Sequence, residues 1–170
     1  MNARQLIEHL KLEPLPVEGG YFRQTYCAAE TLAQSALPSR YNVNKPACTA
    51  IYYLLTSEPD SFSALHRLPT DEIYHFYLGD PVELLLLYPN GSSHRLLLGP
   101  DVLGGQKVQF VVPRDVWQGS RLRAGGEWAL LGTTMAPGFT SEDFAAGDRE
   151  ELIRRYPDQT ELIRALTRTA

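Results

Sequence analysis

The middle of the chain alternates short runs of β-branched and aromatic residues with turns that contain Gly, Pro, Asn or Asp. Runs of this length and spacing, with no helical periodicity between them, predict an antiparallel β-sandwich or β-barrel. The expected strands cover residues 21–27, 48–56, 61–67, 71–78, 82–88, 92–98, 108–112, 116–122 and 127–135. The pair Asn90-Gly91 lies between two of these runs and predicts a hairpin. We therefore expect an all-β fold, with residues 1–170 forming one domain.

Both ends of the chain show helical periodicity instead. Residues 3–12 place their leucines and isoleucine on one face, and Asn2 is suited to cap the helix. Residues 148–157 begin at a capping Asp148, carry acidic side chains early and arginines late, and end at proline. That order of charges suits the helix dipole. Short helices are therefore expected to flank the sheets, with a last amphipathic segment at residues 159–168.

The run ELLLL at residues 83–87 is nearly continuous in apolar residues. A strand with one wet face alternates apolar and polar residues, so a continuous run predicts a strand that is covered on both faces. A partner subunit is one source of the second cover.

The composition is that of an ordinary globular protein of 170 residues, 44% hydrophobic and 21% charged, with a net charge of −4. This acidic balance argues against a nucleic-acid partner, which needs a basic face. No apolar stretch is long enough to cross a membrane, and the first residues do not resemble a secretory signal. Cys27 and Cys48 form no CxxC motif. We therefore expect no disulfide framework, two buried thiols and a cytoplasmic location.

Candidate chemistry is concentrated in the stretch HRLPTDEIYHFYLGDP, where His66 and His75 bracket Glu72. An imidazole and a carboxyl group beside aromatic residues supply an acid/base pair. Alternation along the strand groups Glu72 with Tyr74 and Phe76 and places His75 on the opposite face, unless a bulge rotates it inward.

The same stretch resembles the first motif of the cupins, G-x5-H-x-H-x3-4-E-x6-G. His66 takes the position of the first histidine and Leu68 that of the second. Glu72 and Gly79 take the positions of the glutamate and of the closing glycine. The spacing of the motif is kept, but one metal-ligand position holds a leucine.

Residues 105–122 are similar to the second cupin motif, G-x5-P-x-G-x2-H-x3-N. Pro113 matches, whereas Asp115 occupies the glycine position and Gln118 the histidine position. With EGGYFRQTY, TAIYYLL and WALLGTTMAPGF, these stretches make the chain resemble a small uncharacterised cupin subfamily, Cupin_5-like, a domain of unknown function. The resemblance implies a cupin jelly-roll β-barrel with a pocket in its mouth. It also implies a homodimer.

Cupins that bind iron, manganese or zinc typically use three histidines and a glutamate, and here the resemblance puts His66, Leu68, Glu72 and Gln118 at those positions. Leucine cannot bind a metal, and a neutral glutamine is a weak donor. We therefore expect no cofactor. If a divalent metal does bind, its ligands are expected to be His66, Glu72 and Gln118. This incomplete ligand set disfavours a metal-dependent cupin oxygenase.

Without a metal, His66 and Glu72 remain as an acid/base pair, with His75 as a third catalytic candidate. Such a pair moves protons between carbon and oxygen, as an isomerase or epimerase does. Some cupin relatives are sugar-nucleotide epimerases. The expected partner is a small molecule, sugar-like or carboxylated. The candidate ligand-binding residues are Tyr53, Tyr74, Phe76, Gln118 and Arg23, of which the arginine suits a carboxylate or phosphate. The alternative is a binding module that holds a small ligand without chemistry.

Each candidate also has a structural interpretation. Glu72 can pair with Arg67 or cap a turn, the aromatic residues can fill the core, and Gln118 can satisfy backbone groups inside the barrel. Residues 18–26 can form an edge strand with a bend. Alternatively, this segment can bring Glu18, Tyr21 and Arg23 to the barrel mouth of their own or of a neighbouring subunit.

Overall fold

Strands dominate the structure, a computed structural model that describes residues 1–168. They are β1 (Glu13–Pro14), β2 (Tyr21–Cys27), β3 (Thr31–Leu32), β4 (Lys45–Pro46), β5 (Thr49–Thr56), β6 (Ser63–Arg67), β7 (Glu72–Gly79), β8 (Val82–Leu87), β9 (Ser93–Leu98), β10 (Gln109–Val112), β11 (Trp117–Leu122), β12 (Trp128–Met135) and β13 (Ala145–Ala146). The helical segments are α1 (Ala3–Leu10), η1 (Gln34–Ala36), η2 (Ser141–Asp143), α2 (Arg149–Arg155), η3 (Pro157–Gln159) and α3 (Thr160–Ala165). Each strand that the sequence predicts is present, with bounds that differ by a few residues.

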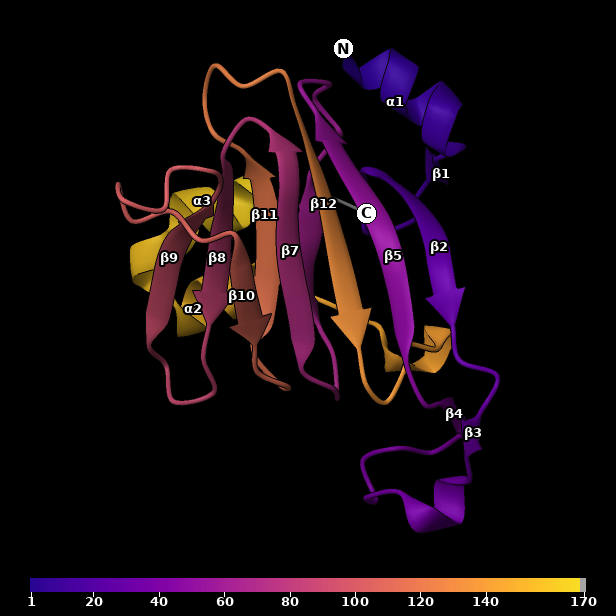
Figure 1. The fold of residues 1–170 in the computed structure, drawn as a ribbon. Helices are drawn as coiled ribbons and strands as arrows, with labels where there is room; N and C mark the ends of the chain where they lie inside the picture. Colours follow the sequence, from indigo (N-terminus) through magenta and orange to yellow (C-terminus); the bar gives the residue numbers. More distant parts are fainter. Residues whose placement is uncertain (169–170) are drawn as a thin grey trace.

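Two antiparallel sheets face each other, and short helices flank them (Figure 1). The first sheet has the strand order β1-β2-β5-β12-β7-β10, and the second has the order β13-β6-β11-β8-β9. A separate two-stranded sheet of β3 and β4 lies beyond the end of the first sheet (Figure 1). The predicted all-β jelly roll with short flanking helices is confirmed.

The main core fills the space between the two sheets. Tyr53 and Tyr74 point inward from β5 and β7, and Leu84 and Leu86 meet them from β8. Each of these four side chains is at most 1% exposed. Because side chains alternate along a strand, every second residue of these strands enters this core.

The chain's own C-terminal helices cover the outer face of β8. Leu85 and Leu87 belong to a second cluster that includes Leu152 of α2 and Ile163 of α3. In Figure 1, α2 and α3 lie behind β8, β9 and β11. The prediction that β8 is covered on both faces is confirmed, but attributing the cover to a partner subunit is wrong. The homodimer itself stays a prediction.

The local signals for helix starts and for the hairpin are confirmed. The side chain of Asn2 caps α1 by accepting a hydrogen bond from the backbone of Gln5, and Asp148 caps α2 in the same way. The turn with Asn90 and Gly91 joins the antiparallel strands β8 and β9. Gly91 has a φ of +88°, a left-handed conformation that glycine adopts without a steric cost.

The expectation that both thiols are buried is wrong. Cys27 is exposed and Cys48 is half-buried, and both are free. The short β1 pairs only with Tyr21 and Phe22, so within residues 1–168 the end of β2 that carries Cys27 has no strand partner on that side. None of the helices within residues 1–168 is long and apolar enough to span a membrane.

Candidate functional site

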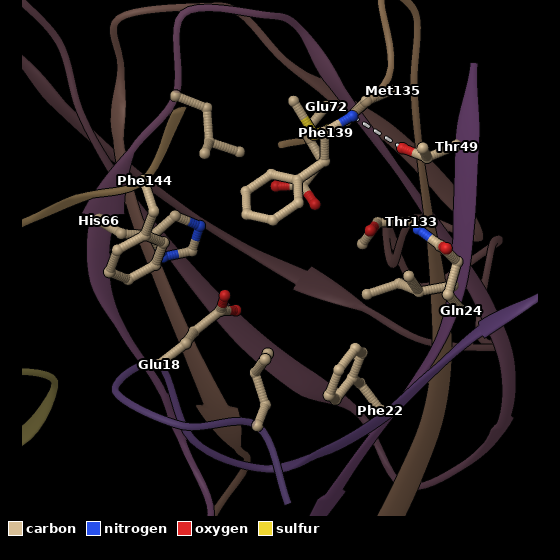
Figure 2. A pocket seen from close by; sticks show the side chains of 13 residues that line it. Glu18, Phe22, Gln24, Thr49, His66, Glu72, Thr133, Met135, Phe139 and Phe144 are labelled. Atoms are coloured by element: carbon tan, nitrogen blue, oxygen red, sulfur yellow. Dashed lines mark hydrogen bonds between the residues drawn. The ribbon is translucent and has the colours of Figure 1, made fainter. Parts of the chain in front are cut away.

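A cavity of about 90 Å³ lies inside the barrel (Figure 2). A single water needs roughly 10–15 Å³ by the same kind of measure, so there is room for several waters or a small organic ligand. Its walls are mostly apolar and contain a few polar side chains. The lining residues are Leu15, Glu18, Phe22, Gln24, Thr49, Ile51, His66, Leu68, Glu72, Thr133, Met135, Phe139 and Phe144. Both residues of the predicted acid/base pair, His66 and Glu72, are among them.

His66 reaches the cavity from β6 with its ring orientation fixed. Its Nδ1 lies 2.8 Å from the carbonyl oxygen of Ala64. A carbonyl oxygen only accepts, so the neutral ring carries its proton on Nδ1 and keeps a lone pair on Nε2. The ring stacks on Phe144, with the centroids 5.1 Å apart and the planes inclined by 19°. His66 is therefore held in one orientation, and its Nε2 has no hydrogen-bond partner among residues 1–168.

Glu72 enters the cavity from the start of β7. Its Oε2 accepts a hydrogen bond of 2.8 Å from Nε2 of Gln118, and only 7% of the residue is exposed. Burial raises the pKa of the Glu72 carboxyl, and the neighbouring charge of Glu18 raises it further. The charge of His66 and hydrogen bonds from Thr133 and Gln118 oppose that rise in pKa. The net result is a pKa of the Glu72 carboxyl above its ordinary value.

Glu18 is a third ionisable group in the cavity, and it comes from the loop between β1 and β2. Its Oε1 accepts a hydrogen bond of 2.7 Å from the hydroxyl of Ser63. The loop is fixed on β6, because Ala64 donates its backbone N–H to the carbonyl oxygen of Glu18 at 2.8 Å. It is also held from the C-terminal end, because Nε of Arg168 donates to the carbonyl oxygen of Val17 at 2.9 Å. Glu18 thus reaches the barrel mouth, which was one of two interpretations of residues 18–26.

The three aromatic candidates for ligand binding lie in the core rather than in the cavity wall. Tyr53 and Tyr74 are each 1% exposed, and Phe76 is 8% exposed. The hydroxyl of Tyr53 donates to the carbonyl oxygen of Gly19 at 2.9 Å, so this tyrosine supports the loop that carries Glu18. Their large rings fill the space between the sheets, which leaves no face of these rings in the cavity.

His75 and Arg23 also lie outside the cavity. Alternation along β7 turns His75 away from Glu72, and its ring nitrogens lie near Thr134 at 3.2 Å and Gln109 at 3.3 Å. No bulge rotates it inward. Nη1 of Arg23 donates to the carbonyl oxygen of Leu10 at 2.8 Å, and the side chain borders an outer groove.

Sequence patterns missed the aromatic residues that close the cavity, Phe139 and Phe144. Both lie in the irregular segment after β12, where no periodicity indicates which side chain points inward. The backbone N–H of Phe139 donates to Oγ1 of Thr49 at 2.9 Å, which ties this segment to β5 (Figure 2).

A buried ion pair anchors the same segment. Lys45 is 0% exposed, and its ammonium contacts the carboxylate of Asp143. Its Nζ also donates to Oγ1 of Thr140 at 2.9 Å, and the backbone N–H of Thr140 donates to Asp143 at 2.9 Å. Lys45 is in β4 and Asp143 is in η2, so the pair joins the two-stranded sheet to the segment that closes the cavity.

The residues at the predicted ligand positions do not fit a transition metal. Leu68 lines the cavity without a donor atom, and Gln118, whose Oε1 has no hydrogen-bond partner within the described residues, is not among the residues that line the cavity. No group of three His, Cys, Asp or Glu side chains within residues 1–168 is arranged to hold a metal ion. Catalytic and structural transition-metal sites usually have three or four protein ligands.

Comparison with known proteins identifies relatives along the whole length. An uncharacterised protein of Saccharomyces cerevisiae, YML079W, is 31% identical over 160 residues, which cover 88% of this chain and 75% of the yeast protein. The crystal structure of protein SO0799 from Shewanella oneidensis is 31% identical and has a TM-score of 0.86, covering 100% of this chain and 99% of that one.

A cupin 2 domain-containing protein from Halorhodospira halophila has a TM-score of 0.54 at 13% identity, covering 92% of this chain and 88% of that one. At that identity the likeness concerns the fold alone. The model of the Cupin_5 family, described as "Cupin superfamily (DUF985)", matches residues 4–147. The chain therefore belongs to the Cupin_5 family of the cupin superfamily, a family whose function is uncharacterised.

Proposed function

We propose that this protein is a metal-independent isomerase or epimerase that binds a small sugar-like or carboxylated molecule in the barrel cavity. His66 serves as the base and Glu72 as the acid. The observation that carries the proposal is that one largely apolar cavity contains an imidazole with an unpartnered Nε2 and a buried carboxyl of raised pKa. Proton transfer requires a base and an acid that face the same bound molecule, and a raised pKa suits Glu72 to the role of the acid.

The chemistry is a proton shift next to a carbonyl group. Nε2 of His66 takes the proton from the carbon beside the carbonyl, while the carboxyl of Glu72 gives its proton to the carbonyl oxygen. The product is an enol or enediol. Return of a proton to either carbon, and of the enol proton to Glu72, completes isomerisation or epimerisation with no change in oxidation state overall. The hydrogen bond from Gln118 holds the Glu72 carboxyl in one orientation during both transfers.

A groove outside the cavity offers a place for a carboxylate end of the substrate. The groove and the cavity share Phe22, Gln24 and Phe139, so the two spaces adjoin. Lys11 and Arg23 also border the groove, together with Glu13, so positive charge is in excess there. Their positive charges favour an anionic group there, as expected for Arg23, while the reacting carbons reach the cavity.

The test is hydrogen exchange at carbon in D₂O, followed by proton NMR, with dihydroxyacetone, glyceraldehyde and pyruvate as probes. Positioned acid/base groups supply roughly 10²–10⁴-fold in rate. We therefore expect His66→Ala and Glu72→Gln each to reduce exchange by about that factor. His75→Ala, which changes a ring on the outer face of the sheet, is the matched control. Equal exchange rates in wild type, His66→Ala and Glu72→Gln would reject the assignment.

A non-catalytic binding module is the second candidate, and the predominantly apolar wall of the cavity favours it. Ligand pockets are lined mainly by apolar side chains with a few polar groups that orient the ligand. A metabolite screen by thermal shift separates the two candidates, because a bound ligand raises the melting temperature whether or not it reacts. Binding without conversion supports the module.

A further inference from the structure

We propose that the cavity accepts the positively charged end of its ligand, an ammonium group, in preference to a neutral or anionic end. The substrate class is then a small amine, such as an amino sugar. This inference rests on the proposed function in one respect, which is that the same cavity is the ligand site.

The charges of the cavity wall are the first argument. Glu18 and Glu72 both line the cavity, and no lysine or arginine is among the described residues that line it. Figure 2 shows the two side chains directed into one space, with the His66 ring beside them. An anion would meet two carboxyl groups there, whereas a cation is attracted by each ionised one. A buried charge must be paired, and Glu18, together with Glu72 when it is ionised, provides the partner for a buried ammonium.

The hydrogen-bonding capacity of the wall is the second argument. In the neutral tautomer that the carbonyl oxygen of Ala64 favours, Nδ1 of His66 carries the proton and Nε2 is an acceptor. One oxygen of Glu18 is engaged by Ser63, and its other oxygen has no hydrogen-bond partner among residues 1–168. Glu72 adds further acceptor capacity when it is ionised. A primary ammonium has three donors and no acceptor, so it complements this set better than a hydroxyl or a carboxylate does.

The aromatic residues are the third argument. Phe22 of β2 borders the cavity together with Phe139 and Phe144 of the segment after β12, and Figure 2 shows their rings around the space that the carboxyl groups enter. The face of an aromatic ring attracts a cation within about 6 Å, most strongly when the cation is desolvated. Phe144 already stacks on His66, which leaves Phe22 and Phe139 as the rings available to the ligand. Carboxylates and aromatic faces together are suited to an ammonium group.

The outer groove and the cavity differ in charge, so a ligand with a positive and a negative end binds in one preferred orientation. Lys11 and Arg23 outnumber the single acidic residue of the groove, Glu13, whereas the cavity has two carboxyl groups and no lysine or arginine among its described lining residues. An ammonium group is therefore drawn inward and a carboxylate is drawn to the outside, so a molecule with both charges has one favoured orientation. This explains how a carboxylated substrate can bind without placing its anion against Glu18 and Glu72.

The test compares three probes that have similar size and different charge, namely propylammonium, 1-propanol and propionate. Binding to the full-length protein is followed by two-dimensional NMR titration, with affinities in the millimolar range expected for such small ligands. We expect propylammonium to bind about tenfold more tightly than 1-propanol, and propionate to bind least. Preference for 1-propanol or propionate would overturn the proposal, and so would no detectable shift of cavity resonances by propylammonium.

Two variants test the cause of the selectivity. Glu18→Gln keeps an acceptor for Ser63 and removes the charge, so it should weaken propylammonium binding by about tenfold and leave 1-propanol unaffected. Phe22→Leu keeps an apolar wall and removes the ring, so it should lower only the affinity for the cation. Glu30→Gln changes an exposed carboxylate outside the cavity and should change neither affinity. Equal losses for propylammonium and 1-propanol would indicate a merely structural effect and contradict the proposal.

The binding assay tests the cation preference and the exchange assay tests the isomerase activity, so one proposal can be rejected while the other stands. Propylammonium cannot undergo the proton shift, so its binding reports the cavity's selectivity even if the protein has no isomerase activity. Carbon–hydrogen exchange without cation preference would retain the proposed function and remove this inference. Cation preference without exchange in any probe would retain this inference and remove the proposed isomerase function.

Discussion

The buried ion pair between Lys45 and Asp143 gives the sharpest test of how the cavity is closed. In Lys45→Met the lysine's apolar stem is replaced by a chain of similar length, and Asp143 keeps its hydrogen bond from the backbone of Thr140 but loses its cation. The lysine side chain is 0% exposed and the aspartate side chain 5% exposed, so water cannot replace the lost partner without a rearrangement. Removing one member of a buried pair typically costs about 3–5 kcal/mol. For a chain of this length, that loss lowers the melting temperature by roughly 6–20 °C.

Urea denaturation measures the free energy of unfolding in a double-mutant cycle. Asp143→Asn is the second single variant of the cycle, because it keeps an acceptor for the Thr140 backbone and removes the negative charge. In Lys45→Met with Asp143→Asn no unpaired charge remains buried, and we expect this double variant to be more stable than Lys45→Met alone. A cost below about 1 kcal/mol for Lys45→Met, or costs that simply add in the double variant, would refute the reasoning.

The same cycle has a consequence at the cavity. Asp143 belongs to the segment that also carries Phe139 and Phe144, and the pair joins this segment to β4. Loss of Lys45 should therefore shift the NMR resonances of the Phe144 ring and of His66, which stack on each other. In Arg154→Ala, an exposed change on α2, those resonances should stay where they are.

Two further predictions concern stability. In the folded protein the pKa of Glu72 is raised above its usual value of 4.5, so the folded state binds more protons than the unfolded state as pH rises from that value. The free energy of unfolding should therefore fall as pH rises through the folded pKa of Glu72. Denaturant titrations at a series of pH values measure this dependence, and Glu72→Gln should make it less steep. An unchanged slope in Glu72→Gln would contradict the prediction. Ile163 is 0% exposed and packs against β8, so Ile163→Ala should lower the free energy of unfolding by about 2–5 kcal/mol. Arg164→Ala, on the exposed face of α3, should lower it by less than about 0.5 kcal/mol. Similar losses for the two variants would argue against packing of α3 on the sheet.

Local patterns were sufficient for much of the fold. The strands, the two capped helices and the hairpin at Asn90 all follow from residues that act on their immediate neighbours. Alternation also separated Glu72 from His75, because successive side chains of a strand point to opposite faces. These features depend on backbone geometry over a few residues, and a single sequence contains that information.

The cavity depends on contacts between distant parts of the chain. The spacing of the cupin motif indicated His66 and Glu72, whereas their meeting with Glu18 depends on the β1–β2 loop, which Ser63 and Arg168 hold on β6. Periodicity could not indicate whether an aromatic residue fills the core or faces the ligand. Tyr53 and Tyr74 fill the core, and aromatic residues from the irregular segment after β12 line the cavity.

The sequence by itself determined the all-β architecture, the flanking helices and the face of β7 that carries Glu72. The tertiary structure alone decided that α2 and α3 cover β8, that Glu18 joins the pair and that Lys45 is paired with Asp143. The physical reason is that secondary structure follows from short-range sterics and alternation. Burial and charge pairing instead act through space, between residues as far apart as positions 45 and 143.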